Sequence, residues 1–290
     1  MDAASRAALR ESRERLTDLT RPASGLLERA RDRVTGQPRV VEAADLVGLA
    51  DELFAVARLL HGQPSLRRAL SDPAAKPADR AALAQRLLGG KVSGATLDLV
   101  ETVARQRWSR PFDLVEAFET LATEAALDAA DARGELENVE DELFRFGRIV
   151  AGDSALSRIL SDRSGPAAGK TALLDRLLAG RVSPVTEQLL RNHLTRPAVS
   201  TAETAIERLS ESASRRRGRS VAHVTAAAPL TAAQEQRLSA VLGRIYGRTI
   251  GVQVTVDPEL LGGLVIRVGD EVIDGSVLRR LDEAGRRLVG

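Results

Sequence analysis

A glycine-flanked lysine is the first candidate for chemistry in this 290-residue chain. The segment 165–171 reads Gly-Pro-Ala-Ala-Gly-Lys-Thr, and nucleotide-binding phosphate loops have a similar Gly-Lys-Thr ending. Such loops carry four residues between their glycines and follow a strand, whereas three residues separate Gly165 from Gly169 and a helical pattern precedes them. The spacing therefore argues against a nucleotide site at Lys170.

The other reactive side chains give no pattern for metal binding or covalent catalysis. His61, His193 and His223 are far apart in the sequence, and none has a second ligand at metal-site spacing. No cysteine is present, which excludes disulfides, thiolate metal sites and a cysteine nucleophile. No Gly-x-Ser-x-Gly elbow occurs, and the paired acids lie on charged helix faces. We therefore predict no catalytic residue, no cofactor site and no metal site.

The densest basic cluster consists of Arg215, Arg216, Arg217 and Arg219. Arginines can contact phosphates, but this cluster lies where a helical pattern gives way to a strand, and the C-terminus of a helix favours cations. Aromatic residues make up only 2% of the chain, which argues against a base-stacking surface. We interpret the cluster as a charged helix end; nucleic acid, acidic protein or lipid headgroups are the alternative contacts.

The composition is that of a folded chain without a membrane span. It is 43% hydrophobic and 28% charged with a net charge of +2, unlike a disordered segment. No uncharged apolar run reaches the roughly 18 residues needed to cross a bilayer. The N-terminus lacks the apolar segment of a signal peptide. We expect a cytosolic protein, or one bound to a membrane only through partners.

A duplication organises most of the chain. Residues 51–54 (Asp-Glu-Leu-Phe) recur as 141–144, and 20 of the 43 positions in 51–93 are identical to the residue 90 positions later. Repeats of roughly 20–50 residues indicate solenoids, whereas 90 residues is the size of a small domain. The pattern predicts two copies of one helical unit; duplication by drift without a new role is the alternative.

Each copy has the apolar spacing of packed helices. In the second copy one helical face is formed by Leu136, Val139, Leu143, Phe146 and Val150. Gly90 and Gly180 suggest helix ends, and Pro197 ends or interrupts the helix that contains Leu189 and Leu190. Residues 3–19 also have a helical pattern, followed in 20–38 by a loop with a short helix.

A strongly acidic helical stretch joins the two copies. Leu114, Phe118, Leu121 and Ala125 mark its apolar face, and from Asp113 to Glu142 eleven acids stand against one base, Arg133. We interpret the acids as a solvated face; a docking surface for a basic partner segment is the alternative.

The period of the apolar residues changes after about residue 219. Alternating residues predict strands around 221–225, 250–256, 264–268 and 272–273. Thr231 and Gln234 have the spacing of a capping box before a helix, and the pattern 277–288 predicts a terminal helix. The order is that of a small mixed α/β domain.

The run 257–276 contains Gly262, Gly263, Gly269, Asp270 and Gly275 at fixed positions around the predicted strands. With these residues it resembles the signature of the delta subunit of F-type ATP synthase, the bacterial relative of the oligomycin-sensitivity-conferring protein. With the helical pattern upstream, the resemblance covers roughly residues 112–288. The extra helical copy ahead of this region is similar to the longer delta subunits of actinobacteria.

The predicted fold class is α+β, with tandem N-terminal helical bundles followed by a small mixed α/β domain. We place the first helical domain at 1–111, the second at 112–214 and the C-terminal domain at 215–290.

The resemblance implies a non-catalytic peripheral-stalk (stator) subunit on the cytoplasmic face of the bacterial membrane. The partners it implies are N-terminal segments of the alpha subunits, bound by the helical part, and the C-terminal region of the b subunit, bound by the C-terminal domain. By analogy with the family, docking on the catalytic head is assigned to the helix around 97–108 or its counterpart around 187–193. The residues so assigned are Leu99, Val103, Trp108, Leu189, Leu190 and His193.

Neither a cofactor, nor a nucleic acid, nor a small-molecule substrate is implied. A free-standing helical adaptor that serves another complex is the main alternative function. An enzyme and a nucleic-acid binder are the remaining ones.

Overall fold

The structure is a computed structural model of the chain. It describes residues 1–20, 45–162, 164–195, 200–219, 221–246, 250–258, 260, 262–268 and 271–276. Most of the predicted loop 20–38, Pro197, the Gly269–Asp270 turn and the predicted terminal helix lie outside the described residues.

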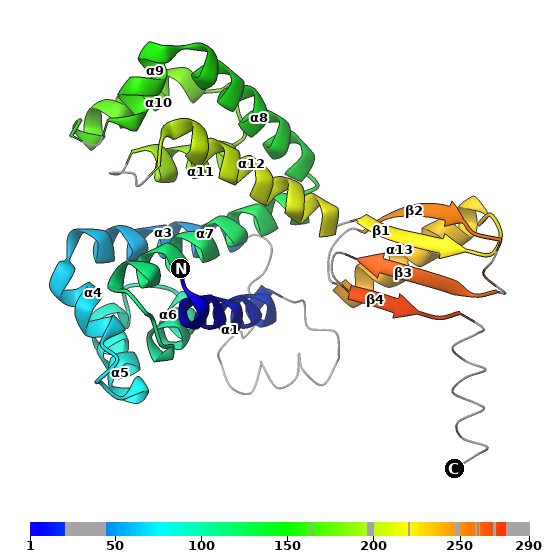
Figure 1. The fold of residues 1–290 in the computed structure, drawn as a ribbon, viewed down its shortest axis with the longest axis horizontal. Helices are drawn as coiled ribbons and strands as arrows, with labels where there is room; N and C mark the ends of the chain where they lie inside the picture. Colours follow the sequence, from blue (N-terminus) through cyan, green and yellow to red (C-terminus); the bar gives the residue numbers. More distant parts are fainter. Residues whose placement is uncertain are drawn as a thin grey trace.

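The first copy is a bundle of helices preceded by an N-terminal helix (Figure 1). Its elements are α1 (Ala3–Thr20), α3 (Leu46–Gly62), α4 (Pro64–Ser71), α5 (Pro77–Leu88), α6 (Gly94–Arg105) and α7 (Pro111–Ala132). Prolines stand in the first turn of α4, α5 and α7, where a missing N–H costs no helical hydrogen bond.

The second copy repeats this succession of helices. Its elements are α8 (Leu136–Gly152), α9 (Ser154–Ser161), α10 (Ala167–Leu178), α11 (Pro184–Leu194) and α12 (Ala202–Arg219). The five residues predicted to share one face of α8 are all buried, so the periodicity identified that face correctly. Gly90 and Gly180 follow α5 and α10 with φ values of 72° and 67°, which confirms them as helix stops.

Helix α7, the last helix of the first copy, also packs against the second copy. It packs along α3 more extensively than any other pair of described helices pack, and it also contacts α11 and α12 of the second copy. In the first copy, α1 packs against α6 and α7. In the second copy, α7 packs against the corresponding helices α11 and α12, so α7 is the counterpart of α1. Small buried side chains let neighbours approach α7 from several sides: Ala117, Ala122, Ala125, Ala126, Ala129 and Ala130. One continuous apolar core consequently runs from α1 to α12.

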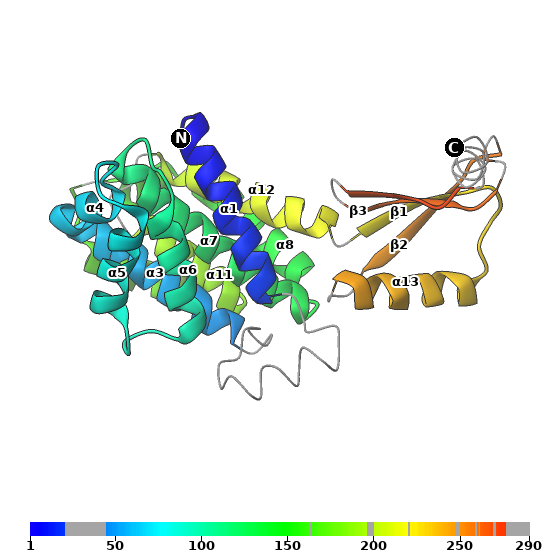
Figure 2. The same ribbon diagram turned by 90° about the horizontal axis from the view of Figure 1, so that it is seen from below.

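The described residues of the C-terminal part form a four-stranded sheet with one helix on a face (Figure 2). Its elements are β1 (Val221–Ala226), α13 (Ala232–Tyr246), β2 (Gly251–Val256), β3 (Leu264–Val268) and β4 (Glu271–Asp274). The strand order is β2-β1-β3-β4, with β1 and β2 parallel and the other pairs antiparallel. A separate core forms under α13, around Val224, Leu242 and Ile266. The α+β prediction is therefore confirmed, with two distinct cores.

The predicted capping box at the start of α13 is present. The backbone N–H of Gln234 donates to Thr231 Oγ1 at 3.3 Å, and the N–H of Thr231 donates to Gln234 Oε1 at 2.8 Å. These two bonds satisfy N–H groups that the first turn leaves without helical partners.

Candidate functional site

The glycines of the C-terminal signature bring two backbone segments into contact. Gly262 and Gly263 have φ values of 146° and 84°, which side chains disfavour. A Cβ on Gly263 would lie 2.9 Å from Ser276 Cα and would clash with the carbonyl oxygen of Gly275. The N–H of Gly275 donates to the carbonyl of Leu264 at 2.9 Å. These signature residues close the end of the β3–β4 hairpin, while Gly269 and Asp270 lie outside the described residues.

The carboxylate of Glu52 on α3 holds the start of α6 by hydrogen bonds. Glu52 accepts hydrogen bonds from the N–H of Ser93 at 3.0 Å and from its hydroxyl at 2.7 Å, and it also accepts one from the Thr96 hydroxyl. Ser93 in turn caps α6 by accepting from the N–H of Thr96. Three of these contacts recur 90 residues later: Glu142 accepts from the N–H of Ser183 and from the Thr186 hydroxyl, and Ser183 accepts from the N–H of Thr186. The duplication has therefore preserved a tertiary contact as well as a helical pattern.

The lysine of the glycine-flanked segment is a structural residue. Lys170 is the counterpart of Arg80, since 170 − 80 = 90, and the two residues are only 4% and 5% exposed. Lys170 Nζ donates to the carbonyl of Leu160 at 2.8 Å. Burial lowers the pKa of the Lys170 ammonium, and the Asp162 carboxylate opposes that shift. Its ammonium is held inside the bundle, where it stabilises the end of α9.

Arg80 makes a larger set of bonds from the same position. Its guanidinium donates to five backbone carbonyls at 2.6–2.9 Å, in the α4–α5 connection and at the end of α6: Asp72, Ala75, Ala104, Arg105 and Gln106. The last carbonyls of a helix have no intrahelical partners, so a buried cation is well placed there.

The residues assigned to docking on the catalytic head lie mostly in the core. Leu99, Val103, Leu189 and Leu190 are 0% exposed and Trp108 is 3% exposed. The indole N–H of Trp108 donates to the carbonyl of Val103 at 2.9 Å, which closes the end of α6. In this structure these five side chains stabilise α6 and α11, and their assignment to a partner stays a prediction.

His193, the sixth assigned residue, lies where the two copies meet. Its ring contacts the edge of Phe54 on α3, with ring centroids 5.8 Å apart, and its Nε2 lies 3.0 Å from the Thr123 hydroxyl on α7. Burial lowers the pKa of the His193 imidazole to about 4, so the ring is neutral near pH 7.

Two further contacts join α3 to α11 beside this ring. The amide of Gln188 donates to Asp51 Oδ1 at 2.6 Å, and Arg58 donates to Asn192 Oδ1. This face of α11 is therefore occupied by the first copy.

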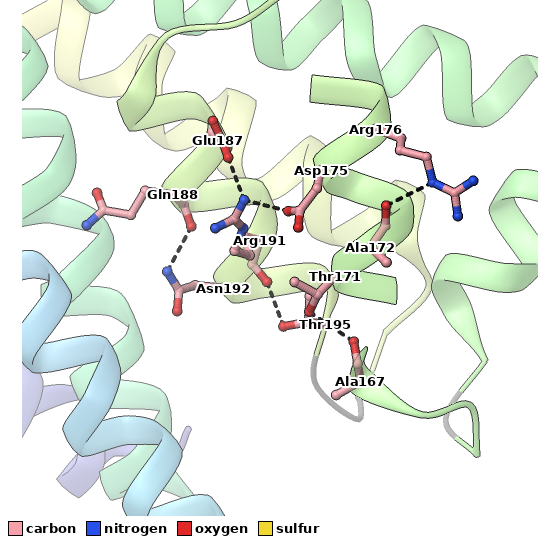
Figure 3. A network of polar contacts seen from close by, with 10 residues as sticks. All are labelled: Ala167, Thr171, Ala172, Asp175, Arg176, Glu187, Gln188, Arg191, Asn192 and Thr195. Atoms are coloured by element: carbon pink, nitrogen blue, oxygen red, sulfur yellow. Dashed lines mark hydrogen bonds and ion pairs between the residues drawn. The ribbon is translucent and has the colours of Figure 1, made fainter. Parts of the chain in front are cut away.

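The opposite side of α11 carries a charged network (Figure 3). The Arg191 guanidinium lies 2.5 Å from carboxylate oxygens of both Asp175 on α10 and Glu187 on α11. The Thr195 hydroxyl donates to the carbonyl of Arg191 at the helix end. All three charged side chains are partly exposed, and such pairs contribute little to stability.

The arginine cluster at the end of α12 pairs with the acidic stretch of α7 and α8. Arg216 forms an ion pair with Asp128, and Arg217 lies 2.9 Å from Glu140 and 3.5 Å from Glu137. The two charged features that the sequence singled out therefore neutralise part of each other. The helix-end interpretation of the arginines is confirmed, and α12 itself supplies a basic segment for the acids.

The structure leaves the remaining histidines apart. The His61 ring lies 6.0 Å from that of Phe112, and His223 is exposed on β1. Within the described ranges no group of three or more His, Cys, Asp or Glu side chains could hold a metal ion. None of the described helices combines the length and apolar character required to cross a bilayer.

Sequence reasoning missed the contacts between the copies. The signal was present in the repeat, because Asp51, Phe54 and Arg58 are identical to the residues 90 positions later. Identity at helix positions outside the apolar face could have indicated that Asp51, Phe54 and Arg58 form a contact surface.

The fold and these contacts define a class of protein built from a duplicated helical bundle and a small α/β domain. Over residues 123–288 the chain matches the family model described as ATP synthase delta (OSCP) subunit. The match begins within α7, so most of the first copy precedes it.

Relatives confirm this class over the full length. The chain is 48% identical to ATP synthase subunit delta of Streptomyces coelicolor over 288 residues, 99% of this chain and 98% of that protein. It is 46% identical to the subunit of Streptomyces griseus over 290 residues, all of both chains. It is 49% identical to that of Frankia alni over 249 residues, 86% of this chain and 90% of the relative. The chain belongs to the ATP synthase delta (OSCP) subunit family, whose members are structural components of the peripheral stalk and partner other subunits of the synthase.

Proposed function

We propose that the chain is a non-catalytic tie that prevents the catalytic head from turning with the rotor, so that rotor torque drives ATP synthesis. The helical part binds N-terminal segments of the alpha subunits, and the C-terminal domain binds the C-terminal region of the b subunit. The chain would then lie on the cytoplasmic face of the bacterial cell membrane, held there through the complex. The three-unit division at residues 111 and 214 stays a prediction within this proposal.

The observation that supports this function is the presence of two separate cores joined by one helix. The helical core runs from α1 to α12, and the second core lies between α13 and the sheet. Helix α12 leads from the second copy toward β1, and the helical and sheet parts lie at opposite ends of the structure (Figure 1). Two separate platforms suit a tie, because several modest contacts acting together outlast any one of them.

Of the two helices assigned to the head, α6 is favoured. Gln188 and Asn192 of α11 are engaged by α3, whereas their counterparts in α6 are Asp98 and Thr102. Asp98 pairs with Arg15 of α1 at 2.6 Å, and both side chains remain partly exposed. A partner segment can therefore reach α6 without separating the two copies.

Trp108 allows a direct test, because it is the only tryptophan and it closes the end of α6. The full chain would be titrated with a peptide of the alpha N-terminus, following tryptophan emission and heat together. Docking on α6 should give both a heat of binding and a shift of the tryptophan emission. The Trp108→Phe variant should keep the heat of binding and lose the emission shift.

A heat of binding without an emission shift would indicate that the docking site lies away from α6. Absence of binding to both the alpha peptide and the b-subunit segment would contradict the proposed function and favour an adaptor for another complex.

A further inference from the structure

Helix α8 carries the same three side chains that contact α11 on α3. In the first copy Asp51 accepts from Gln188, Phe54 contacts the His193 ring, and Arg58 donates to Asn192. The corresponding residues of α8 are Asp141, Phe144 and Arg148, identical in type at an offset of 90. The same polar and aromatic pattern is thus present twice on two equivalent helices.

The two faces differ in what covers them. Phe54 is 2% exposed and packs against His193 of α11, whereas Phe144 is 58% exposed. Asp141 and Arg148 are exposed as well. Asp141 forms an ion pair with Arg145 of its own helix. Breaking such an exposed i,i+4 pair to form a contact with a partner costs little free energy.

The last unit of a repeated array normally has a polar outer face, because no neighbour covers it. Helix α12 follows this rule. Its buried residues Ala202, Ile206, Leu209 and Ala213 correspond at an offset of 88 to Leu114, Phe118, Leu121 and Ala125 of α7. By this offset Thr123, which meets His193, is replaced by the exposed Glu211. Helix α8 departs from the rule by keeping a phenylalanine.

We propose that Asp141, Phe144 and Arg148 of α8 dock one further amphipathic helix, supplied by another ATP synthase subunit. The occupant is a helix of the same chemistry as α11: two side-chain amides four residues apart and a ring beside the second amide. Where His193 meets Thr123 in the first copy, the equivalent ring of the occupant would meet Glu211, so a ring that carries a positive charge is favoured at this position.

A second copy of this chain is a poorer occupant. Its own α11 is already engaged, and releasing that helix would break the bonds of Gln188 and Asn192 and expose Phe54. The inference rests on the proposed function, because it requires other subunits of the synthase to supply the helix.

A matched pair of variants tests this inference. Phe54→Glu should lower the Tm of the isolated chain by several degrees, because it places a charge between the copies. Phe144→Glu should leave the Tm unchanged but weaken incorporation of the full chain into reconstituted ATP synthase roughly tenfold. Ile159→Glu is the control for a general surface effect, since Ile159 is 49% exposed and lies on α9, outside the three-residue face.

A photo-crosslinking residue at position 144 of the purified, assembled enzyme should link α8 to another subunit. Unchanged incorporation of Phe144→Glu, or no crosslink to another subunit, would overturn the inference. A crosslink between two copies of this chain, together with a Phe144-dependent dimer in sedimentation, would overturn it in favour of self-association. Failure of the wild-type chain to join the enzyme at all would instead contradict the proposed function.

Discussion

The two copies hold a buried cation at the same place and depth but use it differently. Arg80 donates to five carbonyls and so joins the α4–α5 connection to the end of α6, whereas one bond, to the carbonyl of Leu160, is described for Lys170. A guanidinium presents a planar fork of donors, and an ammonium is a compact charge. The difference indicates that the first copy depends more strongly on its buried cation than the second.

The largest effect is expected from removing these cations. Arg80→Met should lower the free energy of unfolding by about 4 kcal/mol, because several buried carbonyls lose their donors. Lys170→Met should cost only about 1–2 kcal/mol, because one carbonyl is affected. Urea unfolding of the full chain, with curves analysed for separate transitions, measures both. Equal losses would contradict the proposed asymmetry between the copies.

The shared carboxylate should behave in the opposite way, with equal effects in both copies. Glu52→Leu and Glu142→Leu should each cost about 2 kcal/mol, since each leaves a capping serine N–H and a threonine hydroxyl without their acceptor. Amide hydrogen exchange at Ser93 and Ser183 would locate the loss. A difference above about 1 kcal/mol between the two variants would show that this contact has diverged.

The junction between the copies should respond to acid through His193. Its folded pKa of about 4 lies below the unfolded value of about 6.5, so between these values the unfolded chain holds the extra proton. The contribution of neutral His193 to the free energy of unfolding is therefore fully present above about pH 7 and is lost as the pH drops toward 4. Allowing for partial exposure, we expect a loss of about 1 kcal/mol between pH 7 and pH 5.

The control for this prediction is His193→Gln, which keeps a polar side chain but does not titrate. It should flatten the pH dependence of unfolding in this window relative to the wild type. An unchanged slope in the variant would show that other groups cause the acid sensitivity.

The smallest effect is expected at the exposed pair on α8. Position 145 corresponds to Ala55 of α3, so Arg145→Ala makes the second copy resemble the first. Loss of the pair with Asp141 should change the free energy of unfolding by less than about 0.5 kcal/mol. Thermal unfolding at two salt concentrations tests this, and a larger loss would mean that Asp141 is held more firmly than its exposure indicates.

Local features of the fold were predictable from particular residues. The face of α8, the stops at Gly90 and Gly180 and the capping box of Thr231 and Gln234 follow from spacing over a few positions, and all are confirmed. Such features depend on contacts within one or two helical turns, which the sequence displays directly.

Other features needed the packed chain. The sequence indicated that the arginine cluster is a charged helix end, but it did not show that Arg216 forms an ion pair with Asp128, 88 residues earlier. The spacing already argued against a nucleotide site at Lys170, but the burial of its ammonium against the carbonyl of Leu160 is known only from the folded structure. Residue type alone does not report which distant partner satisfies a charge.

The sequence by itself determined the duplication, the helical units and the α/β domain, because periodicity and repeat identity are properties of the linear chain. Only the tertiary structure decided that Phe54 is covered and Phe144 is exposed, although the two residues occupy identical repeat positions. The physical reason is that burial depends on the neighbour that packs against a face, and α11 reaches α3 from about 140 residues away. Within the described residues, α11 cannot cover Phe144 in the same way, since it already packs against α3.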